Sequence, residues 1–297
     1  MLVYTIKRRI RELNDSLQDP GTREWEVDRA IDMLQRIPRG ELTKQEKKRK
    51  FRPTTLVGGA LENRGDWLAA SGTHRILTGD LGGWEEFHLS WQYRAWSDFV
   101  FLAEFEAGLR NDLGTHRPDA LLTVAAAIAL DEREFTRQFS PRMEATLERE
   151  GFDWGWHGFY PFIWHLSGLW LGLDLPMDHP GLEPMEPYSH LLQVWNDPEQ
   201  VSEGLLWMCE DRMVDLGAER EWNLFMRRLV IDFPAEILAV VRVRHDAGLE
   251  TPLPKHVFLE SPMAHPPDPI PRAVDPLVDS TIAWLRQSLP QLENVAF

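Results

Sequence analysis

The stretch that decides the fold is "WEEFHLSWQYRAWSDFVFLAEFEAGL", residues 84–109. Gly108 suits the end of a helix here, because glycine readily adopts the left-handed backbone conformation that closes helices. The large apolar residues recur three or four positions apart, which places them on one face of an α-helix: Trp84, Phe87, Trp91, Ala95, Phe99 and Leu102. The pattern predicts a long helix with one face in a hydrophobic core.

The same spacing extends along most of the chain, whereas few segments show the alternation of a half-buried strand. We therefore predict an all-α fold of antiparallel helix pairs, in a bundle or a solenoid-like array with long proline-rich loops. A single domain over 1–297 is expected, with 1–50 as a possible N-terminal subdomain and an irregular, proline-rich segment at 251–277. The other expected helices lie at 4–17, 24–37, 55–80, 117–131, 131–150, 161–172, 196–217, 220–231, 233–249 and 277–289.

Four of these helices carry further expectations. Helix 55–80 contains several glycines and is predicted to be one helix, with a kink at the glycines as an option. Helix 117–131 is rich in alanine and nearly apolar, which indicates burial, whereas helix 131–150 is polar and expected to be outermost. Helix 24–37 is expected to place one stripe in the core: Trp25, Ala30, Met33 and Ile37.

An aromatic stretch, "DWGWHGFYPFIWHLSGLWLGLD" at 153–174, is predicted to form a central core helix. Pro161 suits the first turn and Gly172 the end. Apolar residues surround the helix on nearly all sides, which is typical of a buried element, and His165 is interpreted as a core histidine. The helix is too short to span a bilayer, and no secretory signal precedes it. With a single cysteine as well, these features predict a cytoplasmic protein without a membrane partner.

Charge is unevenly distributed along the 297 residues, whose net charge is −15. Residues 1–60 carry 14 Lys and Arg against 9 Asp and Glu, or +5, and the remainder carries 18 against 38, or −20. Nucleic-acid binding needs many Lys and Arg side chains on the phosphates, so we expect no nucleic-acid partner. The five bases from Lys44 to Lys50 are interpreted as a solvated loop or helix end.

No catalytic, metal or cofactor signature stands out, and none is expected. Glu85 and His88 form one Glu-x-x-His pair, whereas a carboxylate di-iron bundle needs two copies. His245-Asp246 could belong to a metal-dependent hydrolase of the His-Asp type, but the last helical turn also favours a capping histidine. Cys209 lies in an apolar helical pattern beside acids, which raise a thiol pKa. Phosphate-binding loops and nucleophile motifs are absent from the sequence.

Several segments resemble the helical immunity proteins of bacterial polymorphic-toxin systems, in which toxins are delivered by contact-dependent or type VI secretion. The segments are "RGDWLAASGTHRILTGDLGGWEEFHLSWQYRAW" followed by "ALLTVAAAIALDEREF", and "FPAEILAVVRVRHDAGL". In the chains of that family an Ala- and Leu-rich helix ends at Gly-Asp or Leu-Asp, and an acidic or aromatic helix follows. The resemblance covers about 55–135 and 230–250 and implies a protein that binds and blocks a cognate toxin. A metal-dependent hydrolase and a helical scaffold or adaptor remain the alternatives.

If the partner is a toxin that acts on nucleic acid, it carries a basic cleft, and an acidic surface would complement that cleft. The acidic loop 174–188 and the helix that follows it are the predicted contact region, with aromatic anchors among the acids. The predicted partner-binding residues are Asp174, Asp178, Glu183, Glu186, Glu203, Glu210, Asp211 and Asp215.

Overall fold

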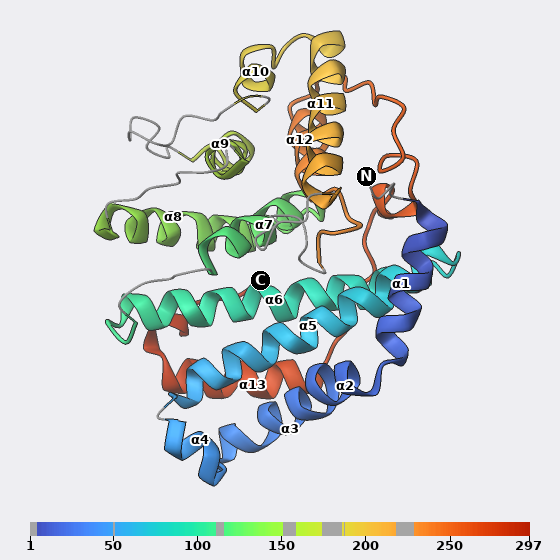
Figure 1. Ribbon diagram of the computed structural model, residues 1–297. Helices are drawn as coiled ribbons and strands as arrows, with labels where there is room; N and C mark the ends of the chain where they lie inside the picture. The colour runs from blue at the N-terminus through green and yellow to red at the C-terminus, as the bar shows by residue number, and fades with distance from the viewer. Residues whose placement is uncertain are drawn as a thin grey trace. The chain divides into compact units, whose positions relative to one another are not determined.

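The computed structural model describes residues 5–49, 51–110, 116–150, 159–173, 186, 188–217 and 229–297. Throughout these ranges the regular structure is helical and no strand occurs, which confirms the predicted all-α fold (Figure 1). The chain divides into two compact units. The hairpin unit comprises Lys7–His116 and Pro267–Ala296, and the α9 unit is built mainly from Arg117–Pro266. The prediction that 1–297 folds as one domain stays a prediction.

The hairpin unit is organised around two long antiparallel helices, α5 and α6, which share the largest interface in the described structure (Figure 1). Helix α3 packs on α5, and α13 packs on α3 and α6. The helices and helical turns of this unit are α1 (Ile6–Gln18), α2 (Pro20–Arg23), a π-helical turn (Glu24–Asp28), α3 (Arg29–Arg36), a 3-10 turn (Ile37–Arg39), α4 (Lys44–Arg49), α5 (Pro53–Leu77), α6 (Gly83–Glu106), α13 (Pro276–Ser288) and a 3-10 turn (Pro290–Leu292).

Glycines on α5 bring the backbones of α5 and α6 into direct contact. A Cβ atom added at Gly72 would lie 2.7 Å from the backbone nitrogen of Phe87 and 2.8 Å from the carbonyl oxygen of Gly83. One added at Gly65 would lie 3.1 Å from the carbonyl oxygen of Ser90. These glycines, which could have kinked the helix, instead form a seam within one uninterrupted α5.

The predicted helix of residues 84–109 is confirmed as α6, which Gly108 follows with a φ angle of 67°. The buried surface of α6 is wider than the predicted stripe, because nearly every side chain from Trp91 to Phe105 is buried. Of the core stripe predicted for helix 24–37, Met33 is only half-buried and Trp25 is exposed. The π-helical turn at Glu24–Asp28 leaves Trp25 exposed, although Ala30 and Ile37 are in the core.

The α9 unit surrounds one short aromatic helix. Helix α9 contacts α8, α10 and α12, and α11 packs on α10 and α12 (Figure 1). Most side chains of α9 are buried, as predicted for a central core helix. Gly172 follows α9 with a φ angle of 61°, as predicted for its end. The helices of this unit are α7 (His116–Ala129), α8 (Arg133–Glu150), α9 (Phe159–Leu171), α10 (Tyr188–Gln193), α11 (Pro198–Gly217) and α12 (Ala235–Asp246).

Two sequence expectations for this unit have different outcomes. Residues 120–130, which lie in α7 and directly after it, are all buried, as predicted from their alanine-rich composition. Helix α8, expected to be outermost, buries one face, where the rings of Phe135 and Phe139 stack with centroids 5.0 Å apart. Its two phenylalanines lie four residues apart among charged residues, so the helix is amphipathic.

The irregular segment predicted at 251–277 is confirmed apart from a 3-10 turn at Pro262–Ala264 and the start of α13. The helix predicted at 220–231 lies largely outside the described residues. Within the described part of the chain, no helix combines the length and apolar character needed to cross a membrane.

The close approach of α5 and α6 leads to a first prediction. We expect Gly72→Ala to lower the free energy of unfolding by about 2–4 kcal/mol, because the new methyl group meets backbone atoms that cannot move independently. Gly59→Ala in the same helix is the matched control. A Cβ atom there meets nothing within 4 Å, so we expect it to stabilise by about 0.5–1 kcal/mol. Chemical denaturation measures the change in the free energy of unfolding for both variants. Equal changes would contradict the close contact between the backbones of α5 and α6.

Candidate partner-binding surface

The structure places the predicted partner-binding residues in three groups. Asp174, Asp178 and Glu183 lie outside the described residues. Glu186 is exposed in a turn before α10. The remaining four are on α11: Glu203, Glu210, Asp211 and Asp215. Helix α11 is therefore the part of the predicted contact region that can be examined as a surface.

Helix α11 begins at the cap that the sequence indicates. The Asp197 carboxylate accepts hydrogen bonds from the backbone nitrogens of Glu199 and Gln200, each at 3.1 Å. These bonds lower the pKa of Asp197. Because the carboxylate satisfies amide groups that have no partner inside the helix, it fixes where α11 starts.

The inner face of α11 is held by packing and by a buried ion pair. Arg212 donates through Nη1 to both carboxylate oxygens of Glu236 on α12, at 2.8 and 2.9 Å, and neither side chain is accessible to solvent. The same guanidinium donates through Nη2 to the backbone carbonyls of Val230 and Phe233. Apolar packing completes this face, where the buried residues are Val201, Leu205, Met208 and Cys209.

The outer face of α11 carries a continuous stripe of acidic and apolar side chains, which we call the acidic-aromatic stripe. Trp207 is 51% exposed and Val214 is 64% exposed, although both are large apolar residues. Acidic residues flank them at spacings of three and four, which places all of them on one side of the helix. The stripe consists of Glu199, Glu203, Trp207, Glu210, Asp211 and Val214, each exposed to solvent.

The charge of this stripe is not compensated by neighbouring bases. The sole Lys or Arg in the α11 sequence is Arg212, which points inward to Glu236. Among the residues that the structure describes, no Lys or Arg pairs with Glu203, Glu210 or Asp211. His256 lies 3.9 Å from Glu210, but burial lowers the pKa of this histidine, so it is neutral at pH 7. The stripe therefore presents net negative charge around an indole ring.

The indole of Trp207 has a defined setting. The ring of His190 on α10 lies 5.5 Å from it, centroid to centroid, with an interplanar angle of 36°. Because a large aromatic ring that is held against a neighbour loses little side-chain entropy on binding, it is well suited to anchor an interface. Trp207 is not among the partner-binding residues predicted from the sequence, although its spacing from Glu203 and Asp211 is visible there.

Cys209 is the residue of α11 with nucleophilic potential, and its setting opposes that role. Its side chain is inaccessible to solvent. Burial, with a smaller contribution from Glu236, raises the pKa of the thiol to about 12. The predicted direction of this shift is confirmed, whereas its main cause is burial rather than the adjacent acids. A thiol protonated at neutral pH is a poor nucleophile.

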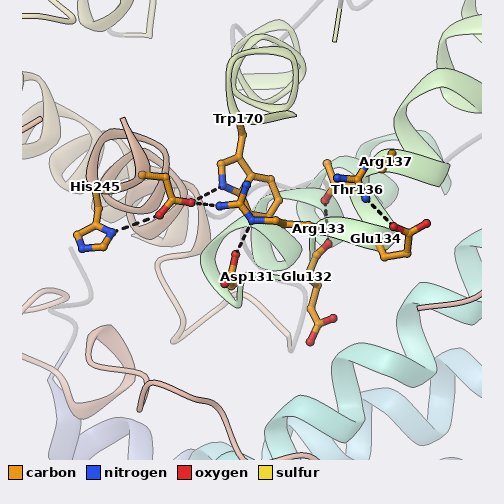
Figure 2. Close-up of polar contacts among 9 residues, drawn as sticks. Asp131, Glu132, Arg133, Glu134, Thr136, Arg137, Trp170 and His245 are labelled. Carbon is orange, nitrogen blue, oxygen red and sulfur yellow. Dashed lines mark hydrogen bonds and ion pairs between the residues drawn. The ribbon is translucent and has the colours of Figure 1, made fainter. Parts of the chain in front are cut away.

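The pair His245-Asp246 is engaged in a structural contact rather than in an open site. Figure 2 shows His245, Trp170 and Arg133 pointing toward one carboxylate, that of Asp246. Trp170 Nε1 donates to its Oδ2 at 2.9 Å, Arg133 forms an ion pair with the same oxygen, and His245 Nδ1 lies 3.2 Å from Oδ1. The Arg133 guanidinium also lies over the Trp170 ring, 4.6 Å from its centroid.

This contact determines the ionisation of Asp246. Burial opposes the charged form, but the hydrogen bonds from Trp170 and His245 and the charge of Arg133 outweigh it and lower the pKa. The carboxylate thus links α8, α9 and α12, whereas the His245 side chain is 77% exposed. The other motif, Glu85 and His88, is split between an exposed acid and a fully buried histidine. Across the described ranges, no three His, Cys, Asp or Glu side chains gather as metal ligands would.

Comparisons with models of protein families, with curated proteins and with solved structures found no match to this chain.

The burial of Cys209 gives a second prediction. We expect its thiol to react with an aromatic disulfide reagent at pH 8 at least about a hundredfold more slowly than free cysteine, because it is inaccessible and protonated. Absorbance at the wavelength of the released thiolate measures the rate. In denaturant, one equivalent per chain should react at the rate of free cysteine, and rapid labelling of the folded protein would contradict the buried setting.

The two members of the His-Asp pair should differ in their effect on stability. We expect Asp246→Asn to lower the free energy of unfolding by about 1–2 kcal/mol, because it removes the charge that Arg133 and Trp170 contact. His245→Ala should change it by less than about 0.5 kcal/mol, since that side chain is largely exposed. Thermal and chemical denaturation measure both. A larger loss for His245→Ala would show that the histidine has a structural role that its exposure conceals.

Proposed function

We propose that this protein is an immunity protein, which binds a basic toxin domain in the cytoplasm through the acidic-aromatic stripe of α11 and neutralises it. The observation that carries the proposal is the exposure of Trp207 and Val214 within a row of carboxylates that pair with no Lys or Arg among the residues the structure describes. The resemblance of the sequence to helical immunity proteins supplies the class of partner.

Each part of the stripe has a distinct role in this proposal. Glu203, Glu210 and Asp211 attract a positively charged surface and raise the rate of encounter. Trp207 then supplies the buried contact area that holds the complex together, since tryptophan is enriched among residues that dominate binding energy. If the toxin is a nuclease, the carboxylates compete with substrate phosphates for the Lys and Arg side chains of its cleft.

The hydrolase alternative has less support from the geometry. A hydrolytic metal site needs several ligands that point toward one position with room for water. Asp246 instead accepts hydrogen bonds from Trp170 and pairs with Arg133 (Figure 2). A helical scaffold or adaptor would use the same kind of surface with a different partner, so the identity of the partner separates it from an immunity protein.

The test is co-expression with the product of the adjacent upstream gene, followed by measurement of growth and of the dissociation constant of the purified complex. We expect wild-type protein to restore growth and Trp207→Ala to weaken binding by about 30- to 1,000-fold, the range for an anchor residue. Trp25→Ala is the matched control, because Trp25 is 49% exposed and belongs to the hairpin unit. It should bind like wild type.

Two triple variants test the role of the acidic residues in binding. The triple change Glu203→Lys, Glu210→Lys and Asp211→Lys should slow association and remove most of its dependence on salt. The control makes the same change in net charge at exposed acids of the hairpin unit: Glu85, Asp279 and Glu293. Equal loss in both triple variants would show that total charge matters rather than the stripe, and failure of the wild type to bind or protect would overturn the proposal.

A further inference from the structure

A groove on the hairpin unit has the features of a small-molecule site and is independent of the proposed function. It has a volume of about 260 Å³ and is bounded by the π-helical turn and α3, by α4 and the residues around it, and by the first half of α5. The lining residues that matter for its chemistry are Trp25, Arg29, Met33, Glu46, Phe51 and Gly59.

Two aromatic rings on the groove remain open to solvent. Trp25 is 49% exposed and Phe51 is 51% exposed, although burying either ring would be favourable. The side of the groove formed by α5 is open at Gly59, because a Cβ atom added there would meet nothing within 4 Å. The groove therefore has apolar surface and open volume for a flat ring.

The backbone contributes to this opening. Trp25 lies in the π-helical turn Glu24–Asp28, directly before α3. One turn of π-helix shifts the register of the residues in it relative to an α-helix, and such turns occur frequently at functional sites. This shift is the reason that Trp25 faces the groove, whereas the continuous helical pattern predicts it in the core.

Two charged side chains line the groove, Arg29 and Glu46. The Glu46 carboxylate accepts from Arg36 at 2.8 and 2.9 Å and from the backbone nitrogen of Thr43 at 2.7 Å, and Arg36 also pairs with Asp32, so Glu46 is engaged within the protein. Arg29 lies over the Trp25 ring, 4.2 Å from the centroid. Within the described residues Arg29 forms no ion pair with a carboxylate.

We propose that this groove binds a small molecule with a flat aromatic body and one anionic group, a carboxylate or a phosphate. The aromatic body would lie between Trp25 and Phe51, and Arg29 would donate hydrogen bonds to the anion while stacked on the Trp25 ring. The volume of about 260 Å³ is slightly below the range of roughly 300–1,000 Å³ for small-molecule pockets, which favours a ligand of one or two rings over a protein segment.

The experiment compares four probes that share one ring system: 2-naphthoate, 2-naphthyl phosphate, 2-naphthamide and 2-naphthylmethylamine. Titration calorimetry and ligand-observed NMR measure binding to the full chain. We expect the anions to bind about tenfold more tightly than the neutral amide, and the cationic amine more weakly still. The ratio between naphthoate and naphthyl phosphate identifies which anion the site prefers.

Three variants test the roles of individual residues. Arg29→Gln should weaken anion binding about tenfold and leave amide binding unchanged, and Arg11→Gln, at an exposed arginine of α1, should change neither. Trp25→Ala should weaken all the probes, with Trp207→Ala as its control. Gly59→Leu should abolish binding by filling the groove while the fold is retained, because its Cβ position is open and leucine favours helix.

Three outcomes would overturn the proposal. They are equal binding of the anions and the amide, binding that survives Gly59→Leu in a folded protein, and the absence of detectable binding of either anion at millimolar concentration. Because the probes contact the hairpin unit and the toxin test uses α11, each proposal fails or succeeds without the other.

Discussion

The hairpin unit depends on the close contact between the backbones of α5 and α6. Gly72 meets Gly83, Gly65 meets Ser90, and Ser97 donates to the carbonyl oxygen of Gly58 at 2.9 Å. In each helix these residues are seven positions apart, so an antiparallel pair brings the small residues together three times along one seam. Since α3 packs on α5 and α13 packs on α6, a wider separation of the two helices would alter the positions of α3 and α13 as well.

The sequence predicts this architecture well where periodicity and helix ends decide it. Residues 84–109, Gly108 and Gly172 illustrate this, because apolar spacing gives the helix and glycine gives its end. The sequence is a weaker guide to which side chains are exposed, because a local change in the backbone or a neighbouring helix decides that. Trp25 is exposed in a π-helical turn, which no pattern of residues in the sequence predicts. Trp207 is exposed because Arg212 and the apolar residues beside it occupy the inner face of α11. The acidic candidates on α11 could be found from composition, and the spacing of Trp207 among them is visible in the sequence, but its exposure depends on which face of α11 packs inward.

Two exposed tryptophans lie in surroundings that differ in charge. Trp207 is surrounded by carboxylates on α11, and Trp25 lies beneath the guanidinium of Arg29. The two surroundings follow the charge distribution of the chain, which is +5 over residues 1–60 and −20 over the remainder. An aromatic ring supplies apolar contact area to any partner, so the flanking charges are the basis for proposing a cationic protein at one ring and an anionic small molecule at the other.

The buried ion pair between Arg212 and Glu236 connects the core of the α9 unit to the proposed binding surface. Taking both charges out of water costs free energy, and packing an apolar pair in their place would often be as stable. The ion pair has a directional requirement that an apolar contact lacks, because Nη1 must meet the carboxylate while Nη2 meets the carbonyls of Val230 and Phe233. That requirement fixes the rotation of α11 about its axis. It removes the one base of the helix from the surface and leaves Trp207 and the acids facing solvent, so the orientation of the stripe is set from within the core.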